Sequence, residues 1–205
     1  MPLVVAADAA PFGDTPMKRW TISLALCAVL ALSACASKNA PEKPPVKLAV
    51  TQVSRGVLIW LPDNVMFDFG AHTLSPEAEG YLRLVADLAM TRTTESLALE
   101  GHTDSVGGAD YNQALSLKRA DAVALALSQL GVPVERMKTA GFGLTRPLAP
   151  NDSDVGRRLN RRVEIIVLNE TVAHLSQGEP ANRFEDAFDK LKAELGDRVN
   201  AGGFR

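Results

Sequence analysis

Residues 96–127, SLALEGHTDSVGGADYNQALSLKRADAVALAL, contain the transition that decides the fold. In the first six residues apolar side chains alternate with other side chains, which predicts a β-strand with one buried face. From position 120 onward apolar residues recur at helical spacing and predict an amphipathic helix: Ala120, Val123, Ala124 and Leu127. Gly131 and Pro133 end this helix. A strand that leads through a polar loop into a packed helix is typical of α/β domains.

The segments on either side extend this pattern. The apolar and β-branched run of residues 50–61 predicts one strand, and NVMFDFG at 64–70 predicts a short extended piece. Ser75-Pro76 is typical of a helix start, and apolar residues follow it at helical spacing: Ala78, Tyr81, Leu82, Val85, Leu88 and Ala89. Residues 138–143 and RRVEIIVL at 161–168 predict two further strands, with a polar loop between them.

The predicted elements follow the order strand, helix, strand, helix, strand, strand. This order predicts an α/β fold, a two-layer βαβαββ sandwich with helices on one face of a mixed sheet. Behind it, Phe184, Phe188, Leu191 and Leu195 are spaced four, three and four residues apart and predict a C-terminal amphipathic helix. Such a helix packs on its own domain or binds a partner; we favour the first.

The N-terminal region contains a targeting signal. Residues 17–19 (MKR) precede the apolar run 20–34, which at about fifteen residues is shorter than the roughly 20 that a spanning helix needs. Residues 32–35 (LSAC) resemble the lipobox of bacterial lipoproteins, in which the cysteine becomes the lipidated first residue. We therefore expect Met17 to be the true start and Cys35 to carry acyl chains such as palmitate.

These signals divide the chain into four parts. They are an upstream extension with a signal peptide (1–34), a lipidated cysteine with a proline-rich tether (35–48), the globular domain (49–170) and a tail with the amphipathic helix (171–205). Ala36 is not the aspartate that retains lipoproteins at the inner membrane of enteric bacteria. We therefore expect an outer-membrane lipid anchor with the domain facing the periplasm.

Composition excludes several classes of function. The net charge of −2 and the pI of about 5.9 provide no basic field for nucleic acid. Both cysteines lie in the first forty residues, so the domain contains no disulfide and no cysteine-based zinc site. His102 and Asp104 offer two metal ligands where a catalytic zinc needs three, and His72 and His174 lie at no ligand spacing from them. We expect neither metal nor cofactor.

The polar loop between strand and helix favours binding over catalysis. His102, Asp104 and Ser116 could form a triad, but Ser116 lies inside the predicted helix and no nucleophile elbow surrounds it, so we do not expect an enzyme. Asn112 and Arg119 are seven residues apart and share one helix face. With Asp104 they would suit a zwitterionic ligand, since an acid binds an ammonium and an arginine binds a carboxylate. Alternatively, Asp104 and Arg119 pair with each other; spacing alone does not decide.

Three segments together resemble a known family: GHTDSVGGADYNQALSLKRADAV (101–123), GFGLTRPLAPN (141–151) and GRRLNRRVEIIV (156–167). The resemblance, over about residues 60–168, is to the OmpA-like peptidoglycan-binding domain. It implies that Asp104 and Arg119 hold the free ends of diaminopimelate in the peptide stem. It further implies supporting contacts, which fall on Thr103, Asn112, Arg161 and Asp68.

The implied function is non-covalent binding of peptidoglycan by a lipoprotein that tethers the outer membrane to the cell wall. An alternative is a wall-sensing signalling or envelope-assembly lipoprotein whose residues 180–200 bind a protein partner. A hydrolase of wall peptides is a distant third. Because apolar faces build the core, we expect the fold to tolerate the loss of Asp104 or Arg119.

Overall fold

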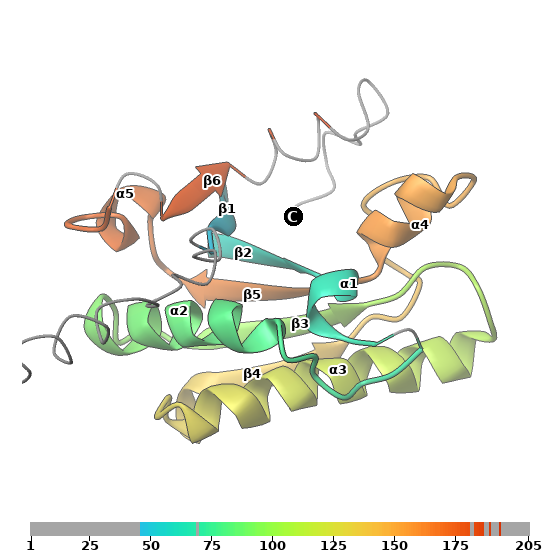
Figure 1. The fold of residues 1–205 in the computed structure, drawn as a ribbon, viewed down its shortest axis with the longest axis horizontal. Helices are drawn as coiled ribbons and strands as arrows, with labels where there is room; N and C mark the ends of the chain where they lie inside the picture. The colour runs from blue at the N-terminus through green and yellow to red at the C-terminus, as the bar shows by residue number, and fades with distance from the viewer. Residues whose placement is uncertain (1–45, 69, 181–182, 187–188, 190–192, 194–205) are drawn as a thin grey trace, which may run out of the picture. The chain divides into compact units, whose positions relative to one another are not determined.

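The computed structural model describes residues 46–68, 70–180, 183–186, 189 and 193 (Figure 1). Its centre is a six-stranded mixed sheet with the strand order β4-β3-β5-β2-β1-β6. In chain order the elements are β1 (Leu48–Val53), β2 (Gly56–Pro62), α1 (Asp63–Met66), α2 (Ala78–Thr91), β3 (Leu97–His102), α3 (Ala109–Gln129), a 3-10 helix (Val134–Arg136), β4 (Met137–Gly141), α4 (Asp154–Asn160), β5 (Arg162–Leu168), α5 (Val172–Leu175) and β6 (Phe184–Asp186).

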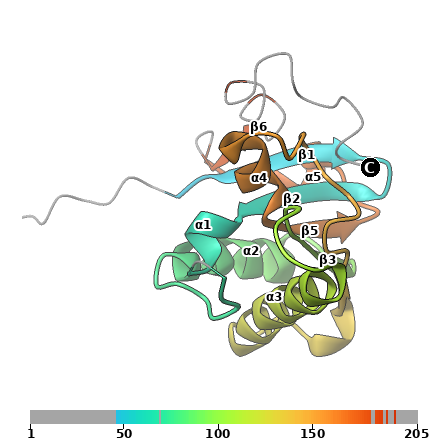
Figure 2. The same cartoon turned by 90° about the vertical axis from the view of Figure 1, so that its right-hand side faces the viewer.

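Helices α2 and α3 cover one face of the sheet, and α4 lies beyond the other (Figures 1 and 2). Alternate residues of the strands point toward α2 and α3 and form the main core with them, including Val57, Ile59, Leu97, Leu99, Val163 and Ile165. The predicted βαβαββ order is confirmed for the succession β2, α2, β3, α3, β4 and β5. A smaller core on the opposite face includes Leu58, Trp60, Leu148, Leu159 and Ile166.

Helix α3 packs directly against β3 and β4 because glycines face it. A Cβ at Gly101 would lie 1.9 Å from the Ser116 carbonyl oxygen, and one at Gly141 would lie 2.6 Å from the Ser116 hydroxyl. That hydroxyl accepts a hydrogen bond from the Gly143 N–H at 2.9 Å. The backbone of α3 thus contacts the backbone of β3 and β4 without an intervening side chain. This contact fixes the position of α3, and of Arg119 on it, relative to the strand ends.

Two expectations for residues 50–70 are wrong. The run 50–61 belongs to two antiparallel strands, in which Ala49 pairs with Trp60 and Val53 pairs with Gly56. Gly56 has a φ of +147°, and a Cβ there would lie 2.0 Å from the carbonyl oxygen of Val167, so only glycine fits at this turn. The piece 64–70 was expected to be extended, but residues 64–66 lie in α1, a single helical turn.

The C-terminal region also differs from expectation. Phe184 lies in β6, where β1 provides a parallel pairing partner, and its side chain packs against the main core. The predicted helix therefore does not begin at Phe184. Strand β6 belongs to the same sheet as the strands of the predicted domain 49–170, and Leu175 of α5 lies in its main core. Phe188, Leu191 and Leu195, like Cys35 and the rest of residues 1–45, lie outside the described residues. No helix within the described residues has the length and hydropathy to span a membrane.

Candidate functional site

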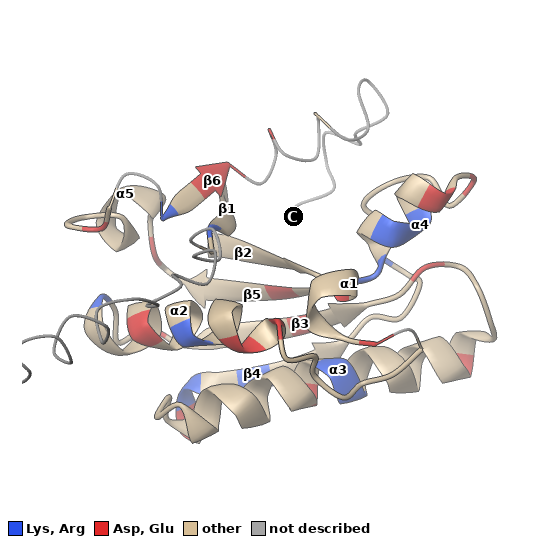
Figure 3. Cartoon of the chain, in the orientation of Figure 1, with Lys and Arg blue, Asp and Glu red and all other residues tan. Residues whose placement is uncertain are grey.

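Three strand ends meet at one end of the sheet. Arg162, the first residue of β5, stands opposite the last residue of β3 and also opposite the last residue of β2. The residues just beyond these pairs therefore lie close together: Asp104 after β3, Arg161 before β5 and Asp63 after β2. Figure 3 shows acidic and basic positions around α1, the loop after β3 and the segment that leaves α4.

Four side chains form a row of alternating charge, which we name the charge chain: Arg119, Asp63, Arg161 and Asp104. Nη2 of Arg119 lies 2.9 Å from Oδ1 of Asp63, without hydrogen-bond geometry, so the contact is an ion pair. Nε of Arg161 lies 3.5 Å from Oδ2 of Asp63, and its Nη1 donates to Oδ2 of Asp104 at 2.7 Å. A direct Asp104–Arg119 pair, one of the two alternatives from the sequence, is wrong because each has another partner.

Arg119 is held from several sides. Its Nε donates to the Ala71 carbonyl oxygen at 2.9 Å, and its guanidinium carbon lies 5.1 Å from the centroid of the Phe67 ring. The side chain is 2% exposed, and this burial lowers the pKa of Arg119 despite the nearby Asp63. Burial likewise raises the pKa of Asp63, against the opposing charges of Arg119 and Arg161. Arg119 is thus part of the buried structure, contrary to the expectation that the fold tolerates its loss.

The loop after β3 is closed by its own polar groups. Oδ1 of Asp104 accepts from the Val106 N–H at 2.9 Å, and Nδ2 of Asn112 donates to the Val106 carbonyl oxygen at 2.9 Å. Thr103 donates its N–H to the Gly143 carbonyl oxygen at 2.9 Å. Its buried Oγ1 has no hydrogen-bond partner within the described part of the chain. In this arrangement Asn112 shapes the loop.

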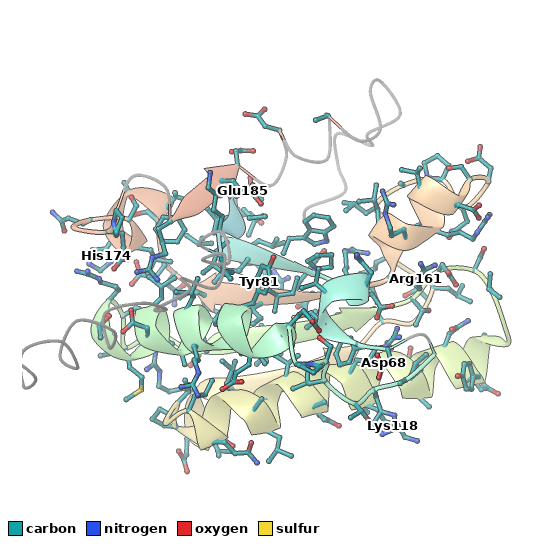
Figure 4. All side chains as sticks on the ribbon, viewed as in Figure 1. Asp68, Tyr81, Lys118, Arg161, His174 and Glu185 are labelled. Atoms are coloured by element: carbon teal, nitrogen blue, oxygen red, sulfur yellow. The ribbon has the colours of Figure 1, made fainter. Side chains whose placement is uncertain are left out.

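Asp68 is exposed and takes no part in the charge chain. Figure 4 shows it on the segment that follows α1, with Arg161 beside α1. Among the six residues implied by the resemblance, the structure therefore brings Asp104, Arg119 and Arg161 together through Asp63, and it leaves Asp68 at the rim.

Sequence reasoning missed Asp63 and Asn160. Oδ1 of Asn160 accepts from the N–H groups of Leu148 and Ala149 at 2.7 and 2.9 Å, and its Nδ2 donates to Oδ1 of Asn151 at 2.9 Å. Oδ1 of Asn151 also accepts from the Ser105 N–H at 3.2 Å, which ties the loop before α4 to the loop that carries Asp104. Asn160 could have been found from the sequence, because it directly precedes Arg161 in a segment that resembles the family. Asp63 gave only a weak signal, an acid that follows Pro62 at the end of a predicted strand.

A second charged cluster lies on the sheet face opposite α2 and α3. Glu100 and Glu164 are direct cross-strand neighbours, and an arginine pairs with each: Arg55 with Glu100 at 2.7 Å and Arg162 with Glu164 at 2.6 Å. These cations offset the repulsion of like charges across the strands. Glu100, His102 and Glu164 place one possible metal ligand each within 4.8 Å of one another, but both carboxylates already hold a guanidinium.

His102 makes the stability depend on pH. Burial, followed by the charges of Arg162 and Arg146, lowers the pKa of His102 to about 2, from 6.5 in an unfolded chain. As the pH falls, the unfolded chain therefore takes up this proton first, so stability present above pH 6.5 is lost toward the folded pKa. From this group alone we expect the free energy of unfolding to fall by about 2 kcal/mol between about pH 7 and pH 5.

Urea unfolding of the wild type and His102→Gln at both pH values measures this contribution. The variant should show a smaller loss of stability on acidification, by about the same 2 kcal/mol. The exposed His72 provides a matched control, and His72→Gln should keep the wild-type pH dependence. The same pH dependence in His102→Gln and the wild type would refute the assignment.

Comparison with known proteins identifies the family. A family model described as the OmpA family matches residues 66–161. The peptidoglycan-associated lipoprotein of Brucella melitensis biotype 1 is 33% identical over 157 residues, which cover 74% of this chain and 93% of the relative. This chain belongs to the OmpA family. The outer-membrane lipoprotein YfiB of Pseudomonas aeruginosa is 32% identical over 150 residues, covering 68% of this chain and 87% of that protein.

Solved structures agree with the OmpA-family fold. The cell wall anchor of the T6SS from Pseudomonas aeruginosa superimposes with a TM-score of 0.54 at 28% identity, covering 60% of this chain and 87% of that one. Other relatives are longer: the chain spans between 14% and 54% of three of them. One is outer membrane porin F of Pseudomonas fluorescens, 40% identical over 104 residues, which cover 51% of this chain and 32% of the porin.

Proposed function

We propose that this OmpA-family chain is an outer-membrane lipoprotein, anchored through Cys35, whose periplasmic domain binds the diaminopimelate stem peptide of peptidoglycan without covalent chemistry. It thereby tethers the outer membrane to the cell wall. The observation that carries the proposal is the charge chain, which ends in an acid, Asp104, and in an arginine, Arg119. Relatives named peptidoglycan-associated lipoprotein, outer-membrane lipoprotein and cell wall anchor support it.

The free end of diaminopimelate carries one ammonium and one carboxylate group, the charges that complement the two ends of the chain. Asp104 accepts hydrogen bonds from the ammonium, and Arg119 donates to the carboxylate. Because the Arg119 side chain is 2% exposed, a ligand carboxylate must compete with the Ala71 carbonyl for its N–H groups. The buried Thr103 hydroxyl supplies a further donor, Asn112 holds the loop, Arg161 pairs with Asp104, and the exposed Asp68 meets the ligand from the rim.

Cosedimentation of the purified mature chain with sacculi tests this function. Sacculi with diaminopimelate stems should retain the protein, whereas sacculi with lysine stems, which lack the second carboxylate, should retain much less. Absence of binding to diaminopimelate sacculi would refute the proposal. Release of soluble wall fragments during the incubation would instead favour a hydrolase.

A further inference from the structure

We infer that Asp63 sets the charge balance of the proposed binding site and so makes it select a ligand end group of zero net charge. This inference rests on the proposed binding of the stem peptide. Asp63 lies outside the three segments that resemble the family, and it follows the strand-ending Pro62.

Asp63 lies between the two arginines of the site. Its carboxylate is 2.9 Å from Nη2 of Arg119 and 3.5 Å from Nε of Arg161, and its side chain is 7% exposed. Asp104, by comparison, pairs with Arg161 at 2.7 Å. Asp63 is therefore the carboxylate that joins Arg119 to the rest of the charge chain.

The backbone around Asp63 fixes its carboxylate in this place. The Asp63 N–H donates to the Arg161 carbonyl oxygen at 3.2 Å, and its own carbonyl accepts from the Phe67 N–H at 2.7 Å. The second bond closes the single turn of α1, and the same turn places the Phe67 ring 5.1 Å from the Arg119 guanidinium. Arg119 is thus contacted by the Asp63 carboxylate, the Phe67 ring and the Ala71 carbonyl oxygen.

Charge counting gives the consequence. Two arginines and two aspartates sum to zero, whereas the same site without Asp63 has a net charge of +1. Charges in a poorly solvated site interact strongly, so its net charge decides which ligand charge it accepts. A balanced site favours the zwitterionic end of diaminopimelate, and a site of +1 favours an end that carries an extra negative charge.

Three synthetic tripeptides that differ only in the far end of the third residue test the inference. In the first this end is the diaminopimelate zwitterion, in the second its carboxylate is amidated and the end is positive, and in the third its amine is replaced by hydrogen and the end is negative. Calorimetric titration at neutral pH gives the three affinities. Wild type should prefer the zwitterion.

Asp63→Asn should shift the affinity ratio toward the negative end by at least about tenfold. Arg161→Met changes the net charge of the site to −1 and should shift the affinity ratio toward the positive end. The Arg161 side chain is 25% exposed, so this variant disturbs the core less than a change at Asp63. Glu164→Gln removes another buried carboxylate that pairs with an arginine but lies on the other sheet face, so it should keep the wild-type ratio.

The outcomes separate the two proposals. If the wild type binds none of the peptides, the proposed function fails. If the wild type binds but folded Asp63→Asn keeps its ratios, the role of Asp63 is refuted. If Asp63→Asn does not fold, Arg161→Met decides, and unchanged ratios in that variant overturn the charge-balance inference.

Discussion

Asp104→Asn should weaken binding of the diaminopimelate stem peptide by about thirtyfold or more while the domain stays folded. The substitution removes the carboxylate that we propose receives the ligand ammonium, and an unpaired charge in a partly desolvated pocket costs about 2 to 5 kcal/mol. At about 1.4 kcal/mol per decade of affinity, the lower value gives the thirtyfold loss. The asparagine side chain keeps an oxygen that accepts from the Val106 N–H, so the loop remains closed.

Calorimetric affinity for the stem peptide, taken together with the melting temperature, checks this result. Asp110, an exposed acid in the first turn of α3, provides the control, and Asp110→Asn should bind like the wild type. Wild-type affinity in folded Asp104→Asn would show that the ligand ammonium binds elsewhere.

Arg119→Met should lower the free energy of unfolding by about 3 to 5 kcal/mol and also abolish binding. Removal of one partner from a buried ion pair is strongly destabilising, and here it leaves the buried Asp63 charge with only the longer contact to Arg161 at 3.5 Å. Arg119→Lys should also lose stability and binding, because an ammonium cannot reproduce the planar guanidinium that contacts Asp63 and Ala71 together.

A double variant separates the two effects. Arg119→Met combined with Asp63→Asn removes both charges and should recover most of the lost stability, but it should not recover binding. Urea unfolding of the single and double variants measures the first effect, and stem-peptide titration measures the second. If Arg119→Met unfolds at the wild-type urea concentration, Arg119 is not an essential partner of Asp63.

The elements that sequence predicted well are those with long, regular patterns. Helices α2 and α3 and strands β3 and β5 carry apolar periodicity over many residues, and burial on one face enforces it. The hairpin of β1 and β2 was missed because only Ser54 and Arg55 separate the paired residues Val53 and Gly56, so the turn is too short to interrupt the apolar pattern on either side clearly. Helix α1 is four residues long, too short to show a helical period. The spacing at Phe184 suited a helix, but the pairing edge of β1 decided in favour of a strand.

The residues of the candidate site likewise differ in how well the sequence predicted them. Asp104, Arg119 and Arg161 lie in segments with a recognisable family pattern, so the resemblance pointed to them. Asp63 becomes important only because β2 and β3 end beside the start of β5. That arrangement depends on strand pairings between residues 60 positions apart (His102 with Arg162) to 112 positions apart (Gly56 with Leu168). Local patterns contain no information on such pairings.

The pairing of Ala49 with Trp60 has a mechanical consequence for a tether. Strand β1 begins at the sheet end where β2 finishes, beside the charge chain. In the proposed tether, a pull between the lipid anchor and a bound wall peptide would thus enter and leave the domain at the same end of the hairpin. The β1–β2 hydrogen bonds then carry the load one after another, as in a zipper, and the turn at Gly56 is the last part of the hairpin to open.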